Sequence, residues 1–110
     1  MKNEIALKWE RFSEDWNSKF GKKPTIESVL LIIGWQEVPA QLIFKNKQVK
    51  TDLIHVGMCT VLSLADIYIK SQIDQDGWPH FEQLVSIEKN PLQVQEEFIK
   101  ENILKYFQID

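Results

Sequence analysis

The stretch TIESVLLIIGWQEVP, Thr25 to Pro39, contains the longest apolar run of the chain, from Val29 to Trp35 with Gly34 as its only interruption. Thr25 can cap the first turn of a helix, and Pro39 ends one because the residue before a proline is pushed out of the α region. On a helical wheel, the apolar side chains point in nearly every direction, which is typical of a helix that is buried on all sides or lies in a membrane. The run of seven residues is far shorter than the ~20 residues that a membrane span needs. The stretch therefore predicts a core helix that the rest of the chain surrounds.

A second apolar helix is predicted from about Asn46 to Leu64. Beyond its polar first turn, apolar side chains occupy most of its circumference, so we expect it to pair with the first helix at the centre of the fold. Each of these two helices contains one interior glycine, Gly34 and Gly57. A glycine in a helix interior costs about 1 kcal/mol relative to alanine, so a compensating contact is expected. Close approach of the two helices is the simplest such contact.

Two amphipathic helices are predicted outside this pair. Residues 3 to 20 place large apolar side chains at spacings of three and four, which puts them on one stripe. The last helix opens at Asn90 and Pro91, an asparagine cap followed by a proline at the first helical position. The side chains expected to be buried are Ile5, Trp9, Phe12, Trp16 and Phe20 in the first helix, and Leu92, Phe98, Ile99, Ile103, Tyr106 and Phe107 in the last.

Residues 66 to 85 change to a period of two, which is typical of strands. The pair Asp76 and Gly77 separates two such segments and is a strong hairpin signal. Pro79 must lie on an edge or at a bulge, because proline has no N–H group for the ladder. A hairpin is marginally stable alone, so we expect it to pack on the helices. The side chains expected to make that contact are Ile67, Ile69, Ile73, Trp78 and Phe81.

Together these elements predict one mainly α domain over residues 1–110, which is long enough to bury a core. We expect a four-helix bundle-like domain with two central apolar helices and a β-hairpin inserted between the third and fourth helices. The segment after Pro39 is expected to be a connection or a short helical turn.

The charge balance and the cysteine content narrow the possible functions. A formal net charge of −3 and a pI of about 5.4 argue against a nucleic-acid partner, because nucleic-acid binders usually carry a basic surface. The single cysteine, Cys59, has no partner for an internal disulfide, and the charged N-terminal residues do not resemble a secretory signal. We therefore expect a cytoplasmic protein that does not bind membranes. Neither a phosphate loop nor a dinucleotide fingerprint is present, so no cofactor is predicted.

The second central helix carries three groups that could react together. Asp52, His55 and Cys59 lie at spacings of three and four, so they share one side of that helix. A thiol beside a histidine that an acid orients is the arrangement of a cysteine nucleophile. However, catalytic partners normally converge from separate elements, and cysteine is often a small buried apolar residue. A structural role for Cys59 is therefore expected. A metal site that combines both histidines, His55 and His80, with a carboxylate is only weakly supported, and no metal is predicted.

A second polar cluster is expected where the two central helices meet. Glu37 lies at the end of the first helix, whereas Asp52 and His55 lie in the first turns of the second. In an antiparallel pair joined by a short connection these ends lie together, so the three side chains are expected to meet. A hydrogen bond between Glu37 and His55 that fastens the helix ends is the favoured role, and a metal or acid–base site is the alternative.

A small acidic domain without a catalytic motif is best interpreted as a binding or interaction module. The candidate contact residues are Tyr68, Trp78, Pro79, His80 and Phe81, because aromatic residues on a hairpin are typical interface anchors. Alternatively, these residues seal the open end of the core. The expected partner is a protein or a second copy of this chain in a homodimer. An acidic inhibitor of the immunity or antitoxin type, with a basic partner, belongs to the same class. The competing function is a small enzyme or metal-binding protein that uses Glu37, Asp52 and His55.

Overall fold

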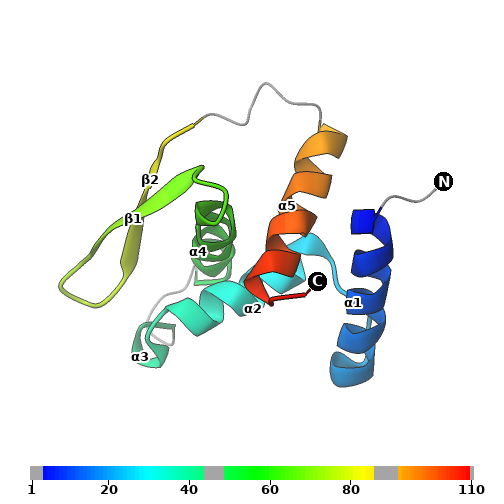
Figure 1. Ribbon diagram of the computed structural model, residues 1–110. Helices are drawn as coiled ribbons and strands as arrows, with labels where there is room; N and C mark the ends of the chain where they lie inside the picture. The colour runs from blue at the N-terminus through cyan, green and yellow to red at the C-terminus, as the bar shows by residue number, and fades with distance from the viewer. Residues whose placement is uncertain (1–3, 44–48, 86–91, 110) are drawn as a thin grey trace.

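The structure, a computed structural model, describes residues 4–43, 49–85 and 92–109. Its elements in chain order are α1 (Glu4–Phe20), α2 (Ile26–Glu37), α3 (Ala40–Ile43), α4 (Val49–Ser63), β1 (Tyr68–Ile73), β2 (Pro79–Gln83) and α5 (Leu92–Tyr106). The predicted mainly helical fold with a hairpin before the last helix is confirmed (Figure 1). The described residues contain five helices, because the connection after Pro39 forms the short α3, so a four-helix bundle is not confirmed.

Helix α2 begins and ends where its sequence predicts. The Thr25 hydroxyl accepts a hydrogen bond from the backbone N–H of Ser28 at 3.1 Å, and the Ser28 hydroxyl accepts one from the N–H of Thr25 at 2.9 Å. This reciprocal capping box satisfies two N–H groups that have no partner inside the helix. At the other end, Val38 is extended, as a residue before proline prefers. The expectation that the apolar run is buried on all sides is wrong at Trp35, whose side chain is 46% exposed.

Helices α2 and α4 cross at their glycines. A Cβ atom added at Gly34 would overlap the backbone carbonyl oxygen of Leu53 and lie 2.7 Å from its carbonyl carbon. A Cβ atom added at Gly57 would likewise overlap the carbonyl oxygen of Leu30, with the carbonyl carbon 2.8 Å away. The predicted close approach is therefore confirmed, and each glycine faces the backbone of the partner helix.

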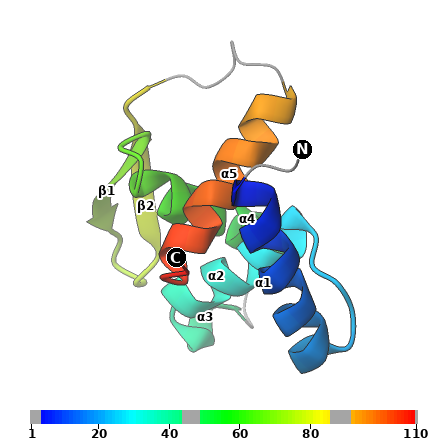
Figure 2. The ribbon, with the colours of Figure 1, turned by 45° about the vertical axis from the view of Figure 1, so that its right-hand side comes forward.

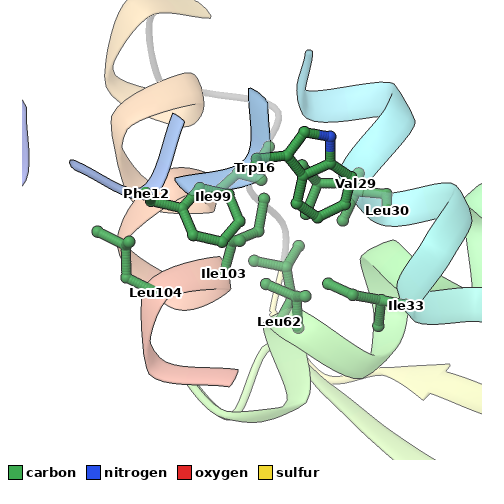
Figure 3. Packing of buried hydrophobic residues seen from close by; sticks show 10 residues of the cluster. Phe12, Trp16, Val29, Leu30, Ile33, Leu62, Ile99, Ile103 and Leu104 are labelled. Atoms are coloured by element: carbon green, nitrogen blue, oxygen red, sulfur yellow. The ribbon is translucent and has the colours of Figure 1, made fainter. Parts of the chain in front are cut away.

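Most of the core lies between α1, α2, α4 and α5. Figure 3 shows how side chains from all four helices meet there. Its buried members are Phe12, Trp16, Val29, Leu30, Ile33, Val61, Leu62, Ile99, Ile103 and Leu104. A smaller cluster of Val38, Ile43, Leu53 and Val56 lies beneath the hairpin. Helix α4 contributes to both clusters, and α2 contributes to the main cluster and packs Leu31 against the smaller one, which makes them the central pair.

The aromatic stripe of α1 is buried only in its middle. Phe12 and Trp16 are buried, and their rings lie 5.6 Å apart between centroids. Trp9 is half-buried, with its ring centroid 5.1 Å from that of Phe12. Phe20 was expected to be buried but is 53% exposed, because it lies at the end of α1 and stacks on Trp16 rather than entering the core.

Helix α5 buries one polar side chain that its sequence pattern does not reveal. Ile99 and Ile103 are buried as predicted, together with Leu104 and the fully buried Asn102. The Asn102 side-chain amide donates to the carbonyl oxygen of Phe98 at 2.9 Å, and none of the described residues donates a hydrogen bond to its own oxygen Oδ1. The predicted helix starts at Asn90 and Asn46, and the side chain of Leu92, lie outside the described residues.

The hairpin is a two-stranded antiparallel sheet with a bulge at Ser71, between Lys70 and Gln72. Pro79 opens β2, where it pairs with Ile73 next to the turn. The prediction that the isoleucines pack inward holds for Ile67, but it is wrong for Ile69 and Ile73, which are 51% and 61% exposed.

The orientation of β2 explains the exposure of Ile69. Successive side chains of a strand point to opposite faces. Pro79 and Phe81 both face the helices, so the intervening His80 and the following Glu82 face away from them. Ile69 pairs with Glu82 and therefore shares its outward face.

Candidate functional site: the hairpin surface

Four of the five predicted contact residues hold the hairpin on the helices. Trp78 and Phe81 are partly buried against the smaller core cluster, and Pro79 is buried. Tyr68 packs against the main core cluster. His80 is exposed. The placement of the other four matches the alternative in which these residues seal one end of the core.

The surface of the hairpin is instead formed by aliphatic side chains. Among the described residues, eight large apolar side chains are about half exposed or more, and four of these belong to the hairpin or follow it directly. We call these four residues the hairpin patch: Ile69 (51% exposed), Ile73 (61%), Leu84 (52%) and Val85 (52%).

Two members of the hairpin patch are neighbours on the outer face. The N–H group of Leu84 donates to the carbonyl oxygen of Ile67 at 2.7 Å, which extends the ladder beyond β2. Leu84 lies two positions after Glu82 and therefore points to the same side. Since Ile69 is the partner of Glu82, the Ile69 and Leu84 side chains are diagonal neighbours on this outer face.

Both strands have an outer edge that pairs with no other strand of the described chain. Such edges present free N–H and C=O groups in the spacing that another strand requires. The hairpin patch and these edges therefore lie together on one projecting element, which Figure 1 shows on the side of α4 that faces away from α1.

Asp74 fixes the turn that joins the two strands. One carboxylate oxygen, Oδ1, accepts hydrogen bonds from the backbone N–H groups of Asp76 and Trp78, both at 3.0 Å. The other, Oδ2, lies 2.9 Å from His80 Nε2. The hydrogen bond from His80 and those from the backbone lower the pKa of Asp74 below its ordinary 3.8. The side chains of Asp74 and His80 are thus engaged in holding the hairpin together.

The structure gives Glu37 a partner from α5. The Tyr106 hydroxyl lies 3.2 Å from both Glu37 Oε1 and Gln36 Oε1. Burial of the Tyr106 hydroxyl, together with the charge and hydrogen bond of Glu37, raises the pKa of Tyr106 above its ordinary 10.0. A neutral Tyr106 thereby fastens the end of α2 to the end of α5.

His55 lies on another face of α4. Leu53, two positions earlier, faces Gly34 of α2. Two positions along a helix of 3.6 residues per turn correspond to a rotation of about 200°, so His55 points away from α2. His55 is exposed, whereas Asp52 is half-buried near the start of α4. In the described part of the chain, no group of three or more His, Cys, Asp or Glu side chains is arranged to hold a metal ion.

Cys59 has the environment of a structural residue. It is fully buried, and its sulfur lies 3.6 Å from Nε2 of His55, one turn earlier. Burial raises the pKa of the Cys59 thiol from 9.0 to about 11, so it carries a proton at neutral pH. A nucleophilic cysteine requires the opposite shift, because the thiolate is the reactive form.

The alternating sequence pattern predicts that Ile69 and Ile73 are buried, and it does not single out Leu84 or Val85. The spacing of Pro79 and Phe81 is the signal that could have shown the position of Ile69. Because these two residues point inward, Glu82 points outward, and so does its partner Ile69 in β1. The bulge at Ser71, which breaks the alternation within β1, has no clear signature in the sequence.

Comparison of the chain with protein-family profiles, with curated proteins and with solved structures finds no match in any of the three. A search of the described helices for one that is both long and apolar enough to cross a membrane also finds none.

Proposed function

We propose that this chain is a small protein-interaction module that binds a partner protein through the hairpin patch. The observation that carries the proposal is the exposure of Ile69, Ile73, Leu84 and Val85 on a hairpin whose aromatic residues are already used to seal the core. Ile69 and Leu84 are neighbours on its outer face, and exposed apolar side chains that gather on one element are characteristic of surfaces that another molecule covers.

The size of the hairpin patch indicates how a partner would bind. Complete burial of a leucine or isoleucine contributes about 1.5–3 kcal/mol, so covering the exposed half of each side chain contributes about 1 kcal/mol. Four such residues give about 4 kcal/mol, which corresponds to a dissociation constant near 1 mM before the costs of association. Apolar contact alone is therefore too weak for a specific complex.

The unpaired strand edges supply the missing interactions. A partner that adds an extended segment to the sheet gains a row of backbone hydrogen bonds, and the side chains of the hairpin patch then select which segment fits. We therefore propose strand addition to the hairpin as the binding mode. A cytoplasmic location is part of the same proposal, on the strength of the single unpaired cysteine.

The proposal is tested by placing a benzophenone photo-crosslinker at position 69 of the full chain and irradiating it in an extract of its own cells. A crosslinked product is expected from position 69 and not from position 7, because Leu7 is similarly exposed but lies on α1. The substitution Leu84→Lys should remove the product, whereas the matched substitution Leu7→Lys should leave it unchanged.

Mass spectrometry of the product identifies the partner, and a product composed of two copies of this chain would make the module a homodimer. Equal crosslinking from positions 7 and 69, or a product that survives Leu84→Lys, would contradict the proposal. Both lysine variants should unfold at the wild-type temperature, because each replaces a surface side chain.

A further inference from the structure

A second surface lies on the opposite side of the molecule from the hairpin, where α1 runs beside α5 (Figure 2). It contains two adjoining hollows of about 400 Å³ and 410 Å³. One is formed by α1 and α5, and the other by α1, α5 and the start of α2. Trp9, Glu96 and Lys100 line both hollows, so the two hollows adjoin at these residues. We call the two hollows together the Trp9 groove.

A cation already lies on the aromatic ring at the centre of this groove. The Lys100 ammonium nitrogen is 5.2 Å from the centroid of the Trp9 ring, which is the geometry of a cation–π interaction. Trp9 is half-buried, and its ring is supported from beneath by Phe12. The ring is thus held in place while part of it faces the groove.

The charges around Trp9 favour a positively charged ligand. Four glutamates line the two hollows: Glu10 and Glu97 in the first, Glu27 in the second and Glu96 in both. Among the described residues, Lys100 is the one cation that lines either hollow, so the described lining residues have a formal charge of −4 + 1 = −3. The whole chain also has a formal net charge of −3, so its charges balance elsewhere. Such a concentration of one sign in a hollow raises the local concentration of ligands of the opposite sign.

We propose that the Trp9 groove binds an arginine side chain of a basic segment of a partner protein. A guanidinium group is planar, so it can stack on the Trp9 ring and at the same time donate paired hydrogen bonds to a carboxylate such as that of Glu96 or Glu27. Lys100 occupies the cation position in the free protein and moves aside when the guanidinium enters. Ile5 and Ile26, which line the two hollows, provide apolar contact for the neighbouring residues of the segment. This inference is independent of the hairpin patch and goes beyond the function proposed above.

The probe is a capped peptide that contains two arginines, added to the ¹⁵N-labelled full-length protein. The signal is the indole N–H resonance of Trp9, which is assigned by its absence in Trp9→Phe. We expect a saturable shift of this resonance with the arginine peptide and none with the same peptide carrying neutral citrulline in place of arginine. Glu96→Gln and Glu27→Gln should each weaken binding at least threefold. Lys100→Ala should tighten binding about three- to tenfold, because it removes the competing cation from the ring.

Glu14→Gln is the matched control, since Glu14 is exposed on α1 but lines neither hollow. It removes the same unit of charge and should change the dissociation constant less than twofold. The proposal is overturned if Glu14→Gln weakens binding as much as Glu96→Gln, because the attraction is then general rather than local. It is also overturned if the citrulline peptide binds equally well, or if Lys100→Ala weakens binding. The glutamine variants change only surface carboxylates, so they test the proposal even if Lys100→Ala does not fold.

Discussion

Replacing Gly57 by alanine should destabilise the protein, although alanine is the better helix former. The added Cβ atom would overlap the carbonyl oxygen of Leu30 and lie 2.8 Å from its carbonyl carbon. Non-bonded carbon atoms prefer about 3.5–4.0 Å, so the helices must separate locally by roughly 1 Å. Overpacking of this kind costs about 1–3 kcal/mol, and the upper end of that range applies here because the obstacle is backbone that cannot rotate away. The gain in helix propensity returns only about 1 kcal/mol.

We therefore expect Gly57→Ala to lower the free energy of unfolding by about 2 kcal/mol, and the melting temperature by about 8 °C or more. Urea unfolding followed by circular dichroism measures the first quantity, and a thermal melt measures the second. The control is the pair Glu14→Gly and Glu14→Ala at an exposed position of α1. There the alanine variant should be the more stable one by about 1 kcal/mol. Alanine should thus be the more stabilising residue at position 14, whereas glycine should be the more stabilising residue at position 57.

The double variant Gly34→Ala/Gly57→Ala provides a second test. One separation of α2 from α4 accommodates both methyl groups, so the double variant should be less destabilised than the sum of the single variants. If Gly57→Ala is as stable as the wild type, or more stable, then the helices separate at little cost and the close crossing is not what compensates for the glycines.

Two further predictions concern titrating groups outside the helix crossing. Folding raises the pKa of the Cys59 thiol from 9.0 to about 11. The stabilisation that comes from the buried, protonated thiol is therefore complete below pH 9 and is lost as the pH rises through 11. The total loss in the free energy of unfolding is about 2–3 kcal/mol. Urea unfolding at several pH values should show a steeper alkaline loss in the wild type than in Cys59→Ala, and parallel curves would contradict the shift. The pKa of Asp74 is lowered in the folded protein. The stabilisation of the hairpin by the Asp74 carboxylate is therefore present above about pH 4 and is lost as the pH falls through the lowered pKa. Asp74→Ala should therefore speed hydrogen exchange of the Trp78 amide at neutral pH, and unchanged exchange would show that the carboxylate does not hold the turn.

The central part of the fold follows from local sequence signals. The apolar runs identify α2 and α4, and the propensity cost of Gly34 and Gly57 already requires the two helices to approach closely. Thr25 marks the start of α2 through its side-chain hydrogen bond, which depends only on residues in the same turn. Such features are predictable because a few neighbouring residues determine them.

The features that the sequence does not predict depend on contacts between distant segments. Glu37 hydrogen-bonds Tyr106, which lies on the last helix, so no local pattern could identify it as the partner in place of His55. The outward position of Ile69 depends on its pairing with β2, and the buried amide of Asn102 interrupts an otherwise apolar face. The exposed apolar surface of the hairpin is therefore formed by other side chains than the five that the sequence pattern favours as contact residues.

The crossing of α2 and α4 also determines which changes this chain can accept as it evolves. Each glycine contacts a main-chain carbonyl that belongs to the residue four positions before the other glycine, Leu30 before Gly34 and Leu53 before Gly57. The leucines take part in this contact through their backbone, so the contact itself does not specify their side chains, whereas a side chain on either glycine must push the two helices apart. A distant relative that keeps this helix pair should therefore retain two glycines at the same separation, even where little other similarity survives. That pair of positions is the signature by which such a relative would be recognised.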